Sequence, residues 1–240
     1  MHERENARMS ENWMIDELAY AGPEHLDEAF VAGFDRKQGY PDPAEDLATF
    51  EAHRLDETSS VVDLGAGTGQ FALPAARRFG QVTAVDVSSA MLRFLDDKAA
   101  ATGLTNLRTA RAGFLSYVHD GPPADGVYTR HALHQLPDFW KAIALDRIAR
   151  ILRPGGVLLV HDLIYDFGPA DADEVFRGWF EGAATDPADG YTGADYAEHI
   201  RTEFSTYRWL FEPMLAVAGF EIVTVNYVHS LYGAYTCVKK

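Results

Sequence analysis

The sequence predicts an α/β fold in which helices cover both faces of a mostly parallel sheet. From residue 60 to residue 160, short β-rich runs alternate with helical segments, and this alternation is typical of parallel strands joined by crossover helices. The run Val157–Asp162 begins with four apolar residues, as expected of a strand buried at the centre of a parallel sheet. Residues 220–225 and 232–238 lie too close together for a crossover helix, so we expect an antiparallel hairpin at the sheet edge.

Helix caps and turn residues set the expected boundaries of these elements. Ser88 or Ser89 is expected to cap the helix that follows the second strand, and Gly103 is expected to end it. The run 153–156 (Arg-Pro-Gly-Gly) combines a helix stop with a turn. We therefore expect strands at 60–63, 81–86, 106–110, 126–129 and 157–162, and helices at 70–79, 89–102 and 138–152.

Two regions fall outside this alternating core. Residues 1–57 are expected to form an N-terminal helical lid, with helices around 13–18 and 43–53. Residues 58–240 are expected to form the ligand-binding domain, with a cap inserted at about 163–210. The cap consists of aromatic-rich helical segments that a loop containing Pro and Gly separates.

The composition is that of a globular protein with an acidic surface. Hydrophobic residues make up 47% and charged residues 24%, so a sizeable core is available. The chain has 36 Asp and Glu against 21 Lys and Arg, a formal net charge of −15. Such a surface repels phosphate backbones and anionic lipid, so nucleic acids and membranes are poor candidate partners. We expect a small-molecule substrate, and either a monomer or a homodimer.

The single cysteine and the N-terminal residues bear on the cellular compartment. Cys237 has no second cysteine to pair with, and its apolar neighbours predict a buried structural thiol in a strand. The first residues are charged and lack the apolar core of a signal peptide. No stretch approaches the roughly 18 apolar residues that span a bilayer. We therefore expect a cytoplasmic protein.

A glycine-rich turn after the first strand marks the candidate ligand site. Gly65, Gly67 and Gly69 follow the acid Asp63, and glycine permits positive φ and a close approach of the backbone to a ligand. The helix after the turn offers free N–H groups and positive dipole potential. Asp86 ends the second strand, where a carboxylate can accept hydrogen bonds from two ribose hydroxyls. Together these features predict a nucleoside-binding site.

Two classes of nucleoside compete for this turn. A dinucleotide fingerprint requires Gly-x-Gly-x-x-Gly, but Gln70 stands at the third required position and Gly69 comes one place early. A carboxylate at Asp63 would lie poorly beside a pyrophosphate, whereas it suits a ligand that carries an ammonium group. A nicotinamide-dependent oxidoreductase is therefore the second hypothesis, and a non-catalytic binding protein is the third.

The sequence from 61 to 92 resembles the class I S-adenosylmethionine (SAM)-dependent methyltransferases. Val61–Gly69 matches the first motif of that family, and Ala84–Leu92 matches the second. The likeness continues through His131–Asp138 and Leu152–Gly156. The resemblance implies a Rossmann-like, seven-stranded, mostly parallel sheet with an antiparallel C-terminal strand. It also implies SAM as cofactor, S-adenosylhomocysteine (SAH) as product, and in-line transfer of the sulfonium methyl group to a small-molecule acceptor.

The resemblance also implies a set of cofactor contacts. Asp86 would hold the ribose, while Val87 and Met91 would flank the adenine. Many relatives place an Asp after the third strand; this chain has Gly113 and Phe114 near that position, so backbone or ring contacts would replace the carboxylate. The cofactor-binding candidates are Asp63, Gly65, Ala66, Gly67, Asp86, Val87, Met91, Gly113, Phe114 and Arg130.

Catalytic candidates are expected beyond the fourth and fifth strands, on the cofactor side of the sheet. His131 and His134 are candidates because histidine titrates near neutrality and can take a proton from the acceptor. Either histidine also fits a structural role in holding a loop. His161 and Asp162 end the fifth strand on opposite faces, and Asp162 is expected to anchor a loop. We expect no metal, because no third ligand beside the two histidines is evident.

The outer regions supply candidate lid residues on the substrate side. These are Arg36 and Tyr40 of the N-terminal segment and Trp179, Tyr191 and Trp209 of the cap. Aromatic faces suit a planar or hydrophobic acceptor and attract a sulfonium by cation–π interaction. The same rings also fit ordinary helix packing. No motif specifies the acceptor, so transfer to oxygen, nitrogen, carbon or sulfur stays open.

Overall fold

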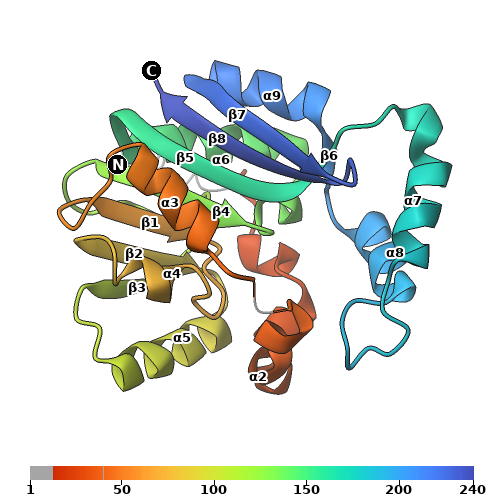
Figure 1. The fold of residues 1–240 in the computed structure, drawn as a ribbon, viewed down its shortest axis with the longest axis horizontal. Coiled ribbons are helices and arrows are strands. Elements are labelled where there is room, and N and C mark those ends of the chain that lie inside the picture. The colour runs from red at the N-terminus through yellow and green to blue at the C-terminus, as the bar shows by residue number, and fades with distance from the viewer. Residues whose placement is uncertain (1–12, 40) are drawn as a thin grey trace, which may run out of the picture.

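The strands of the chain join in one mixed sheet, as the computed structural model shows for residues 13–39 and 41–240 (Figure 1). The sheet has eight strands within the described residues, and seven of them follow the order β3-β2-β1-β4-β5-β8-β7, while β6 pairs with β5. The strands are β1 (Ser60–Leu64), β2 (Gln81–Asp86), β3 (Leu107–Arg111), β4 (Ala124–Arg130), β5 (Leu152–Tyr165), β6 (Thr206–Tyr207), β7 (Phe220–Val228) and β8 (Tyr232–Lys239).

The pairing confirms the predicted fold class. Strands β1 to β5 pair in parallel, and β8 runs antiparallel between β5 and β7. The C-terminal hairpin therefore exists as expected, with β7 at the sheet edge. The short strand β6, which was not expected, extends the sheet beside the end of β5.

Helices surround this sheet. The α-helices are α2 (Glu28–Lys37), α3 (Ala44–Ala52), α4 (Ala72–Ala75), α5 (Ser89–Thr102), α6 (Asp138–Ile151), α7 (Ala172–Glu181), α8 (Gly193–Thr202) and α9 (Arg208–Val217). Short 3₁₀ helices lie at η1 (Glu17–Tyr20), η2 (Pro23–Leu26), η3 (Leu133–Gln135) and η4 (Pro169–Asp171). Figure 1 shows α7 and α8 to one side of the sheet, beyond the end of β5. None of the helices in the described part of the chain is long and apolar enough to cross a lipid bilayer.

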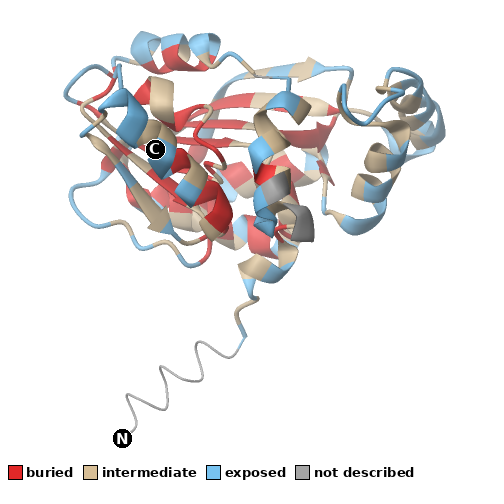
Figure 2. Cartoon of the chain, turned by 90° about the horizontal axis from the view of Figure 1, so that it is seen from below, coloured by how far each residue is buried: buried red, intermediate tan, exposed pale blue. Residues whose placement is uncertain are grey.

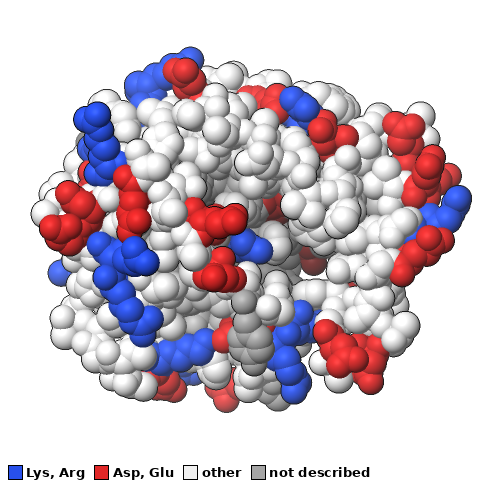
Figure 3. Space-filling model, viewed as in Figure 1, with Lys and Arg blue, Asp and Glu red and all other residues white. Residues whose placement is uncertain are grey.

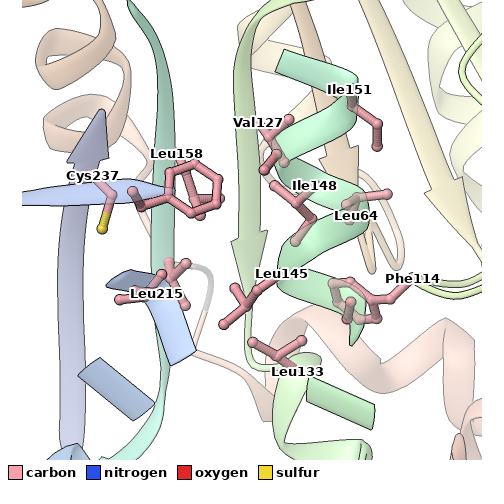
Figure 4. Close-up of a cluster of buried hydrophobic side chains, with 14 of the residues drawn as sticks. Leu64, Phe114, Val127, Leu133, Leu145, Ile148, Ile151, Leu158, Leu215 and Cys237 are labelled. Atoms are coloured by element: carbon pink, nitrogen blue, oxygen red, sulfur yellow. The ribbon is translucent and has the colours of Figure 1, made fainter. Parts of the chain in front are cut away.

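Strand residues alternate between two cores, one on each face of the sheet. In β1, Val62 and Leu64 pack into a cluster with α6 and α9, whereas Val61 packs into a second cluster with α3 and α4. Figure 4 shows part of the first cluster, where Leu64, Ile148 and Leu215 are labelled. Figure 2 shows the buried residues concentrated on the sheet and the exposed ones on the outer helices. Burial of each large apolar side chain there stabilises the fold by about 1.5–3 kcal/mol.

The predicted cap residues mark the two ends of helix α5. The Ser88 hydroxyl accepts a hydrogen bond from Met91 N at 3.1 Å, so Ser88 is the N-cap. Gly103 ends the helix in the left-handed conformation with φ 67°. Cys237 is buried in β8, as its apolar neighbours predicted.

Two expected helices were wrong in extent. The helix expected at 70–79 is the four-residue α4, and the turns that follow it are held by the Asn106 amide, which donates to the carbonyls of Ala76 and Phe79 at 2.9 Å each. The helix expected around 13–18 is the single turn η1, which starts later because Asp16 caps it by accepting from Leu18 N at 3.1 Å.

The topology places the candidate site. From β1 the chain winds to β2 and β3 on one side, and it returns to β4 and β5 on the other. The order of the strands thus reverses between β1 and β4, and ligands of open α/β sheets bind at the carboxyl ends of the strands at such a reversal.

Candidate functional site

The glycine turn connects the end of β1 to α4. Gly65 and Gly67 have φ values of 76° and 51°. The amides of Gly65 and Ala66 donate to the carbonyl of Val85 at 2.9 and 3.0 Å, which ties the turn to β2. A Cβ added at Gly65 would lie 2.3 Å from the Cβ of Ala132, so only glycine fits between the turn and the segment after β4.

Two carboxylates flank this turn. Asp86, at the end of β2, accepts hydrogen bonds from Gly67 N and Ser88 N, each at 2.8 Å. Asp63 is only 2% exposed, and its Oδ2 atom has no hydrogen-bond partner among the described residues. Burial, and then the nearby charge of Asp86, raise the pKa of Asp63 well above its usual range. This buried oxygen is therefore poised to accept from a ligand with a positive donor.

A cavity of about 1320 Å³ lies over the glycine turn and extends beneath the cap. Single-ligand pockets span about 300–1,000 Å³, so this volume is large enough for two ligands side by side. Figure 3 shows the face hollowed near its middle, with acidic and basic side chains around the opening. Of the residues singled out from the sequence, the following line the cavity: Asp63, Gly65, Ala66, Gly67, Asp86, Val87, Met91, Gly113, Phe114, Arg130, His131, His134, His161, Asp162, Trp179 and Tyr191.

Two candidate lid residues do not join them. Arg36 is exposed on α2 and Trp209 is 56% exposed on α9, where its ring stacks on Tyr207 at 5.4 Å between centroids. Neither belongs to the cavity wall. Tyr40 lies outside the described residues. Ordinary helix packing was the expected role for most rings of this aromatic run, and the stacking of Trp209 corresponds to it.

The end of the cavity beside β3 is closed by the N-terminal segment. Glu17 of η1 accepts hydrogen bonds from Leu115 N at 3.0 Å and from Ser116 Oγ at 2.9 Å. Burial raises the pKa of Glu17. A Cβ at Gly113 would lie 2.3 Å from Glu17 Oε1, so a larger residue there would displace this carboxyl group. Glu17 was not singled out from the sequence, because its partners lie about 100 residues away.

The helix α2 is fastened to the glycine turn by Asp35. The Asp35 carboxylate accepts from Lys98 Nζ at 2.5 Å, from Gln70 Nε2 at 3.0 Å and from the hydroxyl of Thr68. Burial opposes the charge of Asp35, but Lys98 and the other donors outweigh it and lower the pKa of this carboxyl group. Arg36 and Tyr40 were the lid candidates predicted in this segment, whereas the contacts to the glycine turn and to Lys98 are made by Asp35.

The N-terminal segment and the cap touch each other at the cavity. The Gln38 amide donates to the Tyr191 hydroxyl at 2.7 Å. Lys37 Nζ lies 3.4 Å from Asp195 Oδ1 and 4.7 Å from the centre of the Tyr191 ring. The two outer regions, which are separated in the sequence by the whole parallel part of the sheet, thus form a joint wall.

At the cap end, Asp162 organises the turn after β4. Its carboxylate accepts from Leu133 N at 2.8 Å, from His134 N at 3.2 Å and from His134 Nδ1 at 2.5 Å. Asp162 therefore anchors a loop, as expected. Burial disfavours a charged imidazole, but Asp162 and Glu203 outweigh it and raise the pKa of His134 to about 9.

His134 meets two residues of the cap that the sequence did not connect with it. Its Nε2 atom lies 2.9 Å from Glu203 Oε2, and His199 Nδ1 contacts the same oxygen. The other ring nitrogen of His199 lies 2.7 Å from Ser205 Oγ. The spacing of His199 and Glu203 places them on one helix face, but only the tertiary fold brings them to His134.

His131 lies between the glycine turn and the cap. It lines the cavity with φ 47°, and its ring centroid is 5.7 Å from that of Tyr232. Burial, and then the charge of Arg130, lower the pKa of His131 to about 3. The ring is therefore neutral near pH 7 and is a weak base.

Aromatic rings from the cap and β8 form the remaining wall. Trp179 stacks on Tyr196 with centroids 4.1 Å apart, and it lies 6.0 Å from both Tyr232 and His199. On the opposite side, Asp46 of α3 lies 2.8 Å from His161 Nε2. The chamber beneath the cap is thus lined by flat apolar faces with a few polar groups, as small-molecule sites commonly are.

Comparison with known proteins gives this geometry a context. A family model for a methyltransferase domain matches residues 61–156, the part that carries β1 to the start of β5. An uncharacterized methyltransferase of Exiguobacterium sibiricum is 29% identical over 174 residues, which are 72% of this chain and 74% of that protein. A trans-aconitate 2-methyltransferase of Deinococcus radiodurans is 39% identical over 120 residues, 49% of this chain and 42% of that protein. The chain thus spans less than half the length of the second relative.

Solved structures show the same architecture. A magnesium protoporphyrin IX methyltransferase from Synechocystis with bound SAM superposes with a TM-score of 0.64, over 95% of this chain and 99% of that chain. The sequence identity is 13%, so this likeness concerns the fold.

Proposed function

Because the chain belongs to the class I SAM-dependent methyltransferases, we propose that its cavity holds SAM at the glycine turn and a small-molecule acceptor beneath the cap. The observation that carries this proposal is the pair of carboxylates at the tips of β1 and β2. Asp63 presents a buried oxygen without a partner, and Asp86 already holds the Gly67 amide. A nucleoside with an ammonium group at one end matches both features.

The residues present fit the cofactor along its whole length. Asp86 would accept from the ribose hydroxyls, and Asp63 would face the ammonium group. Arg130, which lines the same cavity, offers a cation for the carboxylate of the methionine part. Met91 and Phe114 are 3% and 8% exposed, so they contribute apolar edges to the adenine end from within the core.

The proposed reaction is an in-line displacement. SAM supplies a methyl group already activated on a sulfonium. The acceptor lone pair forms the new bond to this carbon while the sulfur keeps the electron pair of the old one, and a protonated acceptor gives up its proton. The protein's task is then to hold the acceptor close and aligned and to exclude water. The joint wall of the N-terminal segment and the cap supports a lid role for both.

The cap end supports a small acceptor. The wall formed by Trp179, Tyr196 and Tyr232 suits a planar or apolar body, and His131 and His134 border the space between this wall and the glycine turn. We propose that these histidines face the acceptor. The relative from Deinococcus is named for a small tricarboxylic acid, which is compatible with an acceptor of this size. A nicotinamide-dependent oxidoreductase is not favoured, because Gln70 replaces the third glycine of its fingerprint.

Binding and transfer can be tested in two steps. Isothermal titration of the purified chain with SAH is expected to show one site per chain, and Asp63→Asn should weaken binding strongly. Binding of NADH with no response to SAH or SAM would overturn the proposal. Incubation with SAM labelled on the methyl group and a fraction of small metabolites is then expected to give a labelled product of low mass. SAH binding without any such transfer would instead identify a non-catalytic binding protein.

A further inference from the structure

A histidine pair and one carboxylate converge at the cap end of the cavity. His134 belongs to η3 after β4, His199 belongs to α8, and Glu203 follows that helix. One ligand atom from each, namely Nε2 of His134, Nδ1 of His199 and a carboxylate oxygen of Glu203, lies within 4.8 Å of the others. We propose that these three residues bind a divalent transition-metal ion that is open to the cavity.

The other nitrogen of each imidazole is already committed. His134 Nδ1 lies 2.5 Å from Asp162 Oδ1, and His199 Nε2 lies 2.7 Å from Ser205 Oγ. Metal-binding histidines commonly use one nitrogen for the ion and the other for a carboxylate or another oxygen, because the second contact fixes the ring and the tautomer. The partners of both rings therefore turn the remaining nitrogens toward the same point.

The contacts at that point favour a cation between them. His134 Nε2 lies 2.9 Å from Glu203 Oε2 and 3.2 Å from Gln135 Nε2, and a metal ion would take the place of the proton that joins this histidine to Glu203. Glu203 Oε2 is buried, and among the described residues it has no hydrogen-bond partner of regular geometry. A metal ion with ligand distances of about 2.0–2.2 Å would satisfy all three atoms at once.

The donor set indicates the class of ion. Two imidazoles and one carboxylate suit zinc, iron, cobalt and related ions, whereas magnesium prefers a shell of oxygens. All three residues line the cavity, so the ion would keep at least one coordination position for a ligand. Three protein ligands with an open position are typical of catalytic rather than structural zinc.

Such an ion would explain how the acceptor is prepared. A metal lowers the pKa of a bound hydroxyl, thiol or similar group, which then releases its proton to water and presents a lone pair to the methyl group. This role rests on the proposed methyl transfer, whereas binding of the metal does not. His134 would then act as a metal ligand and not as the base that takes a proton from the acceptor.

Cobalt titration of the whole chain tests the site. The chain is first dialysed against a chelator, then titrated with Co²⁺, whose visible absorption intensifies when it enters a four- or five-coordinate site. We expect one Co²⁺ per chain, displacement by Zn²⁺ and no displacement by an equal concentration of Mg²⁺. His199→Ala and Glu203→Gln should each weaken binding by at least about tenfold, and His229→Gln, at an exposed histidine outside the cavity, should not.

A second variant and a measurement of SAH affinity allow the metal site to be tested separately from protein folding and from the proposed function. If His199→Ala does not fold, Ser205→Ala leaves all three ligands in place and is expected to lower the affinity by about 10–100-fold. Absence of a Co²⁺ signal in the wild type, or equal binding by wild type and Glu203→Gln, overturns the site. SAH affinity is measured on the same samples. SAH binding without metal binding rejects only the metal site, and metal binding without SAH binding rejects only the proposed function.

Discussion

The two ends of the cavity are lined by different kinds of groups. At the glycine-turn end, the turn and the two acids that flank it lie between residues 61 and 92, and Phe114 and Arg130 join them from neighbouring strand ends. At the cap end, they are side chains of β8, of η3, of α7 and of α8, and long stretches of sequence separate them. A site made from one continuous turn can be recognised from spacing alone, whereas a site made by convergence exists only after the chain has folded.

The carboxylates at the two ends also differ in their surroundings. Asp63 is buried and its Oδ2 atom has no hydrogen-bond partner among the described residues, while Asp86 accepts from the backbone amides of Gly67 and Ser88. Burial raises the pKa of both. Burial also opposes the charge of Asp162 and Glu203 at the cap end, but imidazoles outweigh it and lower their pKa values. One end is thus prepared to receive positive charge from a ligand, while the other holds its carboxylates against histidines.

The largest effect is expected from a single methyl group in the glycine turn. Gly65→Ala places a Cβ against Ala132 at positive φ, so SAH binding should become undetectable by titration calorimetry. Stability in urea should fall by about 1–3 kcal/mol more than for Gly155→Ala. Gly155 has a similar φ of 74°, but its Cβ would meet only the flexible end of Arg153 at 3.5 Å. Equal behaviour of the two variants would show that the turn tolerates a side chain.

Loss of one negative charge should have the next largest effect. Asp86→Asn keeps the shape of the side chain but removes a charged acceptor, and hydrogen bonds to charged groups contribute about 1.5–3 kcal/mol. SAH affinity is therefore expected to fall by roughly 10–100-fold in calorimetry. Asp96→Asn, on the exposed side of α5, serves as the control and should bind normally. An unchanged affinity for Asp86→Asn in a folded protein would contradict the ribose contact.

The fastening of α2 should matter less. Asp35→Asn weakens the contacts to Lys98 and the glycine turn, so we expect SAH to bind about 3–10-fold more weakly and to leave faster in stopped-flow measurements. Glu28→Gln is a matched control, because Glu28 and Arg93 join the same two helices at 2.5 Å but are 76% and 59% exposed. Exposed pairs of this kind contribute little. A lid role for α2 would be rejected if both variants bound SAH like the wild type.

The smallest effect on cofactor affinity is expected at the cap. Trp179→Ala removes the stack on Tyr196, so SAH affinity should stay within about twofold while the cap loosens. Aromatic pairs contribute about 0.5–1.5 kcal/mol, which corresponds to cleavage in loop 183–192 up to about tenfold faster in limited proteolysis. Trp209→Ala, outside the cavity wall, should leave that cleavage rate unchanged. A large loss of SAH affinity in Trp179→Ala would show that the two ends are not separable.

The division between the two ends also explains what the sequence could predict. The fold class, the cap of α5 at Ser88 and the cavity position of Asp63 and Asp86 followed from local spacing, turn chemistry and family motifs. The length of α4 did not, and the turns after it are held by the Asn106 side chain, which comes from a distant loop. The contact between Glu203 and His134 could not be predicted, because His134 precedes the cap in the sequence and only the folded chain brings the two residues together.

The bridge from Gln38 to Tyr191 has a kinetic consequence. The bridge couples the two outer regions, so a movement of one region away from the cavity would require the other to follow or the bridge to break. If the proposed function holds, we expect the release of SAH and of the methylated product to be coupled through this movement. In the proposed enzyme, the frequency of this movement would contribute to the turnover rate.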